Sequence, residues 1–366
     1  MDSGTDYRIY DIPEEEGMSE SAERYREGTR KKKLTILGLA VCIIVCAAAS
    51  LIMGNSDMSA LDVLAAFFTH DTQSLIGKYV WNIDLPIMVA AAVVGAGLAL
   101  AGVIMQCILK NPLASPYTLG LSSAAAFGAA FSIMYLNSGA VFSSGILGEV
   151  CTPLCAFASS MIATGIIIAL VKLTRVSTET VILAGIAVSS IFSAGLTLMQ
   201  YLSDPVMMSE IVSWTFGSVT DADWRWDLIM LSVLLCIAVY YMAERWTLNA
   251  LNAGDEVARG LGVNTDRFMV VGLILASLLS AVMLSKFGII AFVGLLGPHM
   301  ARMLIGDDHR FLIPASLLIG ALLMIIADGV ALNIVRPMVL PVGLLTSLLG
   351  GPAFIYLLIR RYRSRY

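Results

Sequence analysis

The stretch LNALNAGDEVARGLGVNTD, residues 248–266, decides how the rest of the chain must be arranged. Long apolar runs lie on both sides of this polar stretch, so it has to leave the bilayer that those runs cross. The pattern predicts two short helices separated at Gly254. Asp255 and Glu256 stand where the second helix would begin, and the helix dipole favours carboxylates at that end.

The second predicted helix would present Val257, Arg259 and Leu261 to its surroundings, and Gly260 and Gly262 would end it. A loop that only joined two spans could be a handful of residues long. The stretch is therefore either a solvated connector, as charged segments commonly are, or a docking element whose helices fit a groove on a soluble partner.

The amino-acid composition is that of a membrane protein. Of the 366 residues, 58% are hydrophobic and 14% are charged, and the mean hydropathy is +0.83. A soluble domain carries about 25% charged residues. The six cysteines all lie in or beside apolar runs without a C-x-x-C pair, which indicates packing residues rather than a disulfide or a metal site. We therefore expect an all-α polytopic membrane protein.

Ten apolar runs are each close to the ~20 residues that a helix needs to cross a bilayer. Residues 1–33 precede them and are hydrophilic, so we expect a disordered tail rather than a secretory signal. Residues 34–366 would then form one transmembrane domain. The predicted spans are 34–53, 86–107, 118–136, 151–171, 180–202, 228–243, 268–285, 289–305, 312–334 and 342–359.

The second predicted span has a particular pattern of small residues. It opens with Pro86, whose missing N–H costs nothing at the start of a helix. Small side chains then recur along it, which lets neighbouring helices approach closely in lipid. These small residues are Ala91, Gly95, Gly97, Ala99, Ala101 and Gly102.

The basic residues predict the orientation of the chain. Ten spans place both termini on one side. With the N-terminus inside, all but four of the 23 lysines and arginines face the cytoplasm, which satisfies the positive-inside rule. Residues 248–266 and both termini would then be cytoplasmic. The four basic residues left outside are Lys78, Arg225, Lys286 and Arg336.

Motifs for catalysis and nucleotide binding are absent from the sequence. It contains no G-x-x-x-x-G-K-[ST] and no H-E-x-x-H, and its three histidines lie far apart. We therefore expect neither an enzyme nor a bound metal or cofactor. Asp328 is the one clear ionisable group within a predicted span, which leaves an ion-coupled secondary transporter as a rival. A carboxylate that caps a broken helix, or bonds to a neighbouring span, is the commoner explanation.

Several long motifs follow one another in the chain. They include VGAGLALAGVIMQ…LKNPLASPYTLG at the second span and its exit, DPVMMSEIVSWTFGSV at 204–219, FVGLLGPHMARMLIGDDHRFLIP at 292–314 and LPVGLLTSLLGGPAFIYLL at 340–358. Over about residues 55–360, these motifs resemble the FecCD-type permeases. Those proteins are the membrane subunits of type II ABC importers for iron–siderophores, haem and cobalamin.

The resemblance implies a homodimer of ten-span subunits in lipid, with the transport pathway along the twofold axis. Two ATPase subunits would dock on the cytoplasmic side and a substrate-binding protein outside, and no nucleic-acid partner is expected. The cargo would be an iron chelate or related metallo-macrocycle that crosses the cytoplasmic membrane of a prokaryote. The motifs do not choose between ferric siderophore, haem and cobalamin.

The resemblance also favours docking as the role of residues 248–266. In the family this segment is the coupling element that contacts the ATPase. The positions that match it here are Leu251, Gly254, Asp255, Glu256, Ala258, Arg259, Leu261 and Gly262.

Two further motifs are implied to be functional. The short loop between the fourth and fifth spans resembles the family's cytoplasmic gate through Ser177 and Thr178, and Glu179 follows where small polar residues are common. Asn111 and Pro112 belong to the exit motif of the second span. Because Asn is a good N-cap and Pro suits the first helical position, we expect them to start a helix.

The external face departs from the family. Many members carry an R-x-P-R-like motif before the second span, whose arginines meet carboxylates on the binding protein. This sequence has Asp84-Leu85-Pro86-Ile87 there, and Val339 replaces the family's acidic residue before L-P-x-G. Alternative basic candidates for docking the binding protein are Lys78, Arg225 and Arg336.

Overall fold

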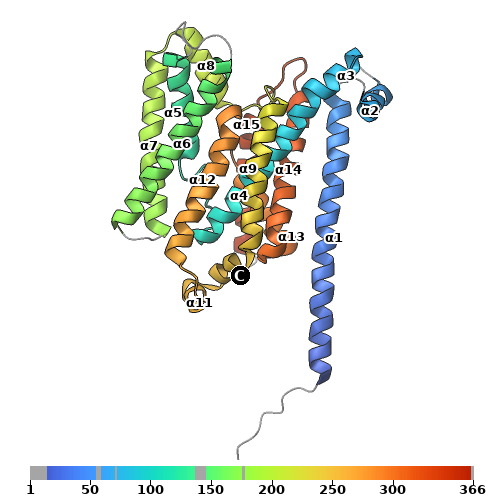
Figure 1. Ribbon diagram of the computed structural model, residues 1–366, viewed down its shortest axis with the longest axis vertical. Coiled ribbons are helices and arrows are strands. Elements are labelled where there is room, and N and C mark those ends of the chain that lie inside the picture. The colour runs from blue at the N-terminus through green and yellow to red at the C-terminus, as the bar shows by residue number, and fades with distance from the viewer. Residues whose placement is uncertain (1–14, 55–58, 71, 137–145, 175–177, 364–366) are drawn as a thin grey trace, which may run out of the picture.

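The computed structural model describes residues 15–54, 59–70, 72–136, 146–174 and 178–363, which form a bundle of helices (Figure 1). No strand occurs among these residues. The helices and two π-helical segments are, in chain order, α1 (Glu15–Gly54), α2 (Ala60–Thr69), α3 (Leu75–Tyr79), η1 (Val80–Asp84), α4 (Leu85–Ile108), α5 (Leu121–Phe131), η2 (Ser132–Leu136), α6 (Ile146–Thr174), α7 (Thr178–Leu202), α8 (Pro205–Thr215), α9 (Trp224–Ala243), α10 (Arg245–Ala253), α11 (Asp255–Gly260), α12 (Thr265–Phe287), α13 (Val293–Ile305), α14 (His309–Asn333) and α15 (Val342–Arg363).

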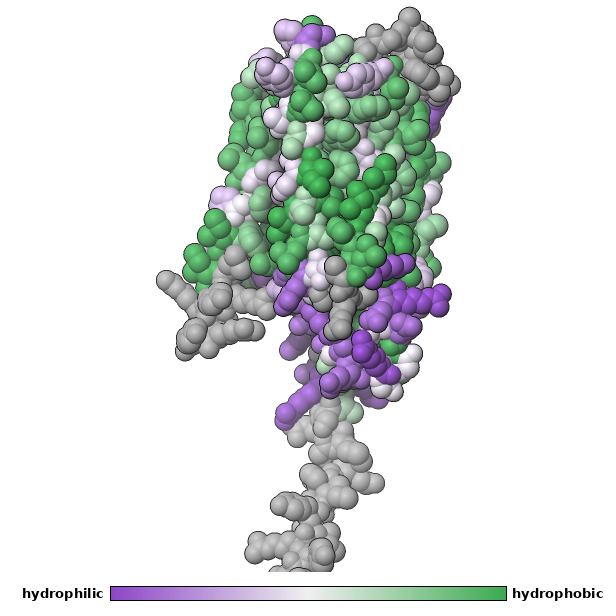
Figure 2. Space-filling model, turned by 90° about the vertical axis from the view of Figure 1, so that its left-hand side faces the viewer, coloured by the Kyte–Doolittle hydropathy of each residue, from purple (hydrophilic) through white to green (hydrophobic). Residues whose placement is uncertain are grey.

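The all-α polytopic fold is confirmed. By length and composition, seven helical stretches of the described residues are long and apolar enough to cross a membrane. The other three predicted spans coincide with shorter apolar helices, namely α5 continued by η2, α13 and α15. Figure 2 shows one face of the molecule, where hydrophobic side chains cover most of the height and hydrophilic ones gather at the lower end. Figure 1 places α11 at that same end.

Within the predicted disordered tail, residues 1–33, helix α1 corrects the prediction for residues 15–33. It begins at Glu15 and continues without a break into the first span, while residues 1–14 lie outside the described part of the chain. Glu, Ala, Arg and Lys are strong helix formers, and a helix that extends an existing span bears no nucleation cost. The 40 residues of α1 make it about 60 Å long, so about half of it extends beyond a hydrocarbon core of about 30 Å.

Helix α4 lies at the centre of the bundle. It packs against α14, α12, α13 and α9, and its residues are nearly all buried. A second group of helices, α5, α6 and α7, packs together and joins the centre through α12. Figure 1 shows α4 running obliquely between these groups, whereas α1 lies at the edge, against α14.

Close packing around α4 depends on the predicted small residues. A Cβ atom added to Gly95 would lie 2.2 Å from the carbonyl oxygen of Gly320 in α14. One added to Gly102 would lie 1.8 Å from the carbonyl oxygen of Gly294 in α13. Pro298 lies within α13 and has no N–H to offer the Gly294 carbonyl. The Gly294 carbonyl therefore has no donor at the usual position four residues later. It lies against the backbone of α4 instead.

Pro86 lies in the first turn of α4, as the sequence predicts, but the helical run begins before it. Residues 75–108 form one continuous helical run, in which the π-helical segment η1 comes directly before α4. The N–H of Leu85 bonds to the carbonyl of Val80, which is the wider π-type spacing. A π-helical turn relieves the contact between a proline ring and the carbonyl of the preceding turn.

Asn111 and Pro112, in contrast, do not start the helix that the sequence predicts. The chain leaves α4 in a turn, in which the Ala114 N–H bonds to the Asn111 carbonyl at 3.0 Å. The Leu113 N–H bonds to the Asn111 side-chain oxygen at 2.9 Å. Pro116 explains the difference, because a proline four residues after Pro112 cannot donate to its carbonyl and its ring would collide with it.

Gly102→Ala should destabilise the protein, since the added Cβ would force α13 away from α4. Overpacking of this kind costs about 1–3 kcal/mol. Gly38→Ala in α1 is the matched control, because a Cβ there meets nothing within 4 Å. It should be neutral or slightly stabilising, since alanine is the better helix former. Thermal unfolding in detergent compares the two; equal midpoints for both variants and the wild type would contradict the packing role.

Candidate functional site

The two short helices that the sequence predicts within residues 248–266 are α10, which begins slightly earlier at Arg245, and α11, and they lie at one end of the bundle (Figure 1). The helices meet at Gly254, whose backbone has φ 129° and ψ 156°. That conformation is essentially restricted to glycine. Each helix buries one side, through Leu248 and Leu251 of α10 and Ala258 of α11.

The end of α11 is also defined by its backbone. The N–H of Gly262 bonds to the Arg259 carbonyl at 2.9 Å, and the N–H of Val263 bonds to the Ala258 carbonyl at 3.0 Å. Gly262 has φ +86°, so the helix closes in a Schellman motif with glycine in the left-handed position. The predicted end at Gly262 is confirmed, and Gly260 is the last helical residue.

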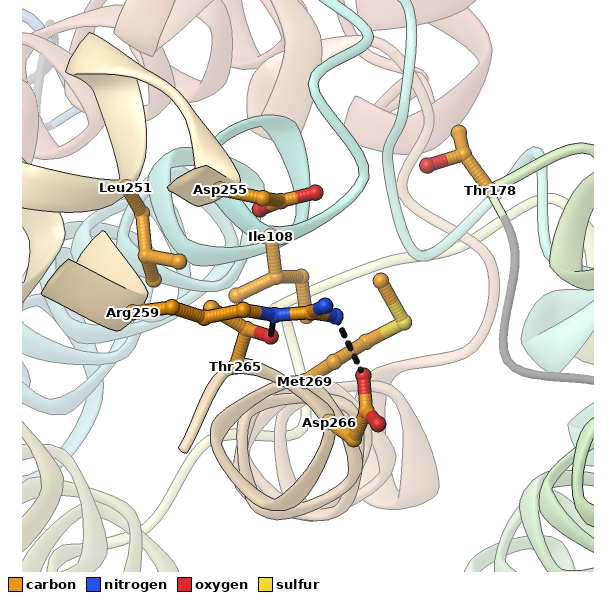
Figure 3. A pocket seen from close by; sticks show the side chains of 8 residues that line it. All are labelled: Ile108, Thr178, Leu251, Asp255, Arg259, Thr265, Asp266 and Met269. Atoms are coloured by element: carbon orange, nitrogen blue, oxygen red, sulfur yellow. Dashed lines mark hydrogen bonds and ion pairs between the residues drawn. The ribbon is translucent and has the colours of Figure 1, made fainter. Parts of the chain in front are cut away.

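Two ion pairs connect α11 to neighbouring spans. Lys110, directly beyond α4, places its Nζ 2.8 Å from Oδ1 of Asp255. Arg259 donates from Nε to Thr265 Oγ1 at 3.0 Å and lies 3.4 Å from Asp266 Oδ1 at the start of α12 (Figure 3). Exposed pairs of this kind contribute only about 0–1 kcal/mol to stability. They place α11 relative to α4 and α12 rather than stabilise the fold.

Helix α10 is connected to the start of α14 through Asn249. Its side chain accepts from the His309 backbone N–H at 2.9 Å and donates to Asp308 Oδ1 at 3.1 Å. Partial burial alone would raise the pKa of Asp308, but hydrogen bonds from Arg310 and Asn249 lower it to about 2. The Asp308 carboxylate is therefore ionised at physiological pH. No local sequence pattern reveals this contact, because 59 residues separate its partners.

A hollow of about 250 Å³ lies between these helices and the start of α7. Figure 3 shows the Arg259 side chain reaching toward Thr265 and Asp266, with Thr178 on the opposite side of the hollow from Leu251. The hollow is lined by Ile108, Thr178, Leu251, Asp255, Arg259, Thr265, Asp266 and Met269.

The hollow brings one predicted gate residue close to the predicted coupling residues. Thr178, the first residue of α7, shares the hollow with Asp255 and Arg259. Glu179 is exposed beside it, and Ser177 lies outside the described residues.

The outer surface of α11 carries an uncovered apolar pair. Val257 is 48% exposed and Leu261 is 71% exposed. Residues four apart lie on the same helix face, and Glu256 is exposed next to them. An apolar patch with charged neighbours at the hydrophilic end of a membrane protein is typical of a surface that another protein covers.

The predicted external docking residues are all exposed, but they differ in their surroundings. Lys78 and Arg225 come from adjacent segments, since the indole N–H of Trp224 bonds to the Trp81 carbonyl at 2.9 Å. The Arg336 guanidinium donates to the Met53 carbonyl and the Asn333 side chain. Arg336 therefore holds the end of α1 against the end of α14.

Asp328 is buried within α14, where it is 4% exposed. Helix α14 is continuous from His309 to Asn333. The carboxylate therefore does not cap a broken helix, which removes one of the explanations that the sequence left open.

Comparison with known proteins assigns this bundle to the membrane permease subunits of ABC importers. The model of the FecCD transport family matches residues 41–360, and the chain belongs to this family. It is a multi-pass membrane protein of a prokaryotic importer, distinct from the ATPase and the binding protein with which such permeases work.

Two relatives and one solved structure illustrate the match. A Methanocaldococcus jannaschii protein assigned as an ABC transporter permease is 42% identical over 344 residues, which cover 93% of this chain and 98% of the relative. The hemin transport system permease of Yersinia pestis is 35% identical over 334 residues, covering 90% and 97%. An inward-facing structure assigned to a metal-chelate type ABC transporter has a TM-score of 0.76 at 29% identity and covers 90% of this chain and 99% of its own.

Gly254→Ala should loosen the junction of α10 and α11, because alanine is strained by about 1–3 kcal/mol in this conformation. Gly260→Ala is the matched control, since it also has open space around an added Cβ but lies within a regular helix. Amide hydrogen exchange over residues 255–260 should speed up in the first variant only. Unchanged exchange in Gly254→Ala would show that the junction does not depend on glycine.

Proposed function

We propose that α10 and α11 transmit the movement of a partner ATPase to the transmembrane helices of this permease. One observation carries the proposal: the two helices are connected at three points to the ends of α4, α12 and α14, while their outer apolar pair is uncovered. The three connections are Lys110–Asp255, Arg259–Asp266 and Asn249–Asp308.

Through these connections, one displacement of α10 and α11 would move the ends of several transmembrane helices. If a soluble partner displaces α10 and α11 as a unit, three helix ends are displaced together. Because α4 is packed backbone to backbone against α13 and α14, its movement would carry them as well. Alternating access would follow from this rearrangement, with ATP hydrolysis confined to the partner.

The start of α7 would be the gate on the same side. Thr178 faces the hollow that Asp255 and Arg259 also line, so a movement of α11 reaches it directly. We assign Ser177 and Glu179 to the same gate. Along its length, α7 leaves apolar side chains exposed, among them Leu183, Ile191 and Leu198. A second copy of this chain would cover them in the homodimer.

The end that carries α10 and α11 would face the cytoplasm. Lys110, Arg259, Arg302 and Arg310 all belong to segments at this end, as the positive-inside rule requires. Both termini would lie on the same side, in the cytoplasmic membrane. On the outer face, Lys78 and Arg225 are the proposed contacts for the binding protein, whereas Arg336 has a structural role.

The proposed cargo is an iron chelate or related metallo-macrocycle. The family assignment, the hemin permease relative and the metal-chelate type structure support this class. The ligand that the partner binding protein retains would identify the cargo as a ferric siderophore, haem or cobalamin. Equilibrium binding of each compound to that protein is the decisive test.

Leu261→Asp should weaken the permease–ATPase complex at least tenfold, because burying an unpaired carboxylate in a contact surface costs about 2 kcal/mol or more. The same loss is expected for Glu256→Arg, which reverses a neighbouring charge. Co-purification of the ATPase and its titration against detergent-solubilised permease measure the effect.

The control for this experiment is Val335→Asp, since Val335 is 42% exposed and lies just beyond the opposite end of α14. It should leave ATPase binding unchanged, and all three variants should unfold at the wild-type temperature. Wild-type affinity for both Leu261→Asp and Glu256→Arg would rule out this docking surface.

Asp328→Asn should retain most uptake in vesicles that contain the complete importer. The driving force is ATP under the proposed function, and a proton gradient should have no effect in the absence of ATP. Uptake that a pH gradient drives without the ATPase, and that Asp328→Asn abolishes, would favour the ion-coupled carrier instead.

A further inference from the structure

The first part of α1 approaches the coupling helices although it lies outside the family match. That match begins at residue 41, whereas α1 begins at Glu15. Residues 22–33, named here the α1 extension, precede the first predicted span. Within it, the Tyr25 hydroxyl accepts a hydrogen bond from Nη2 of Arg310 at 3.0 Å. This bond joins positions 285 residues apart.

Arg310 connects the start of its own helix, α14, to α1 and to α10. Its Nε and Nη2 donate to Asp308 Oδ2 at 2.9 and 2.6 Å, and Nη2 also donates to Tyr25 of α1. The guanidinium carbon lies 4.9 Å from the ring centre of Trp246 in α10. The guanidinium therefore makes several directed hydrogen bonds and a cation–π contact at once, a combination that lysine cannot reproduce.

A second contact joins the α1 extension to the same place. Lys32 Nζ lies 5.4 Å from the ring centre of Phe311, and the Arg310 guanidinium lies 5.4 Å from that ring as well. Tyr25 and Lys32 are seven residues apart, which is two helical turns, so both lie on one side of α1. That side is packed against the start of α14.

We propose that Arg310 and the α1 extension form a brace that holds α10 in one position relative to the membrane spans. Arg310 is a positioning residue: it acts through Trp246 and through Asp308, which Asn249 of α10 also contacts. Its effect on transport rests on the proposed coupling role of α10. Whether Arg310 and the α1 extension hold α10 in position does not depend on the ATPase, so it can be tested on the permease alone.

The brace has a mechanical consequence for the importer. Any displacement of α10 must either carry α1 with it or separate Arg310 from Tyr25. With the brace intact, movement of α10 is resisted until the partner supplies enough energy, and it then involves the first span. Without the brace, α10 moves independently, so ATP is hydrolysed with less cargo transported.

Hydrogen exchange of the purified permease, without the ATPase, tests the brace directly. Tyr25→Phe removes only a hydroxyl from a side chain that is 57% exposed, so folding is not at risk. Exchange should become severalfold faster in both residues 22–33 and 245–253. Arg310→Lys should produce a larger increase over 245–253. The matched controls are Tyr201→Phe and Arg267→Lys, which alter exposed residues of α7 and α12 and should change neither segment.

The outcomes separate the brace from the proposed function. Unchanged exchange over 245–253 in both Tyr25→Phe and Arg310→Lys would overturn the brace, whatever the ATPase does. An effect of Arg310→Lys alone would overturn the part assigned to α1. In the complete importer, Tyr25→Phe should bind the ATPase normally but transport less cargo per ATP hydrolysed, and an unchanged ratio would contradict the mechanical consequence.

Discussion

Backbone contact at the glycines of α4 is the constraint on which the rest of the structure depends. In lipid, burial of apolar side chains provides no driving force for helix association, so close packing must provide it. Gly95 meets the backbone of Gly320, and Gly102 meets the carbonyl of Gly294. Larger side chains at these positions would separate α4 from α13 and α14. The central bundle is therefore positioned by the glycines of one helix, where the absence of a side chain lets the neighbouring backbones approach.

The position of the coupling helices follows from the same packing, because α4 ends beneath them. The Cys107 thiol, near the end of α4, donates to the Leu248 carbonyl of α10 at 3.5 Å. Lys110 then adopts φ +46° as the chain turns, and its side chain reaches Asp255 at the start of α11. One helix thus links the tightly packed centre of the membrane domain to the surface that we assign to ATPase docking.

Much of this arrangement can be predicted from sequence because it depends on local pattern. Apolar runs of the right length indicate the spans, and a glycine between two amphipathic segments indicates the junction at Gly254. Asn111 and Pro112 have the local pattern of a helix start, but Pro116, four residues beyond Pro112, prevents the helix. The helical form of residues 15–33 depends on continuity with the first span. The Arg310–Tyr25 bond joins distant positions, and no spacing rule reveals it.

The central claim is that α11 contacts the ATPase, and site-specific photo-crosslinking tests it most directly. A photoreactive amino acid at position 261 should form an adduct with the ATPase in the assembled importer. The same amino acid at position 198, on the exposed apolar face of α7, should not. An assembled, transport-competent importer that yields no adduct from position 261, or equal adducts from both positions, would contradict the account.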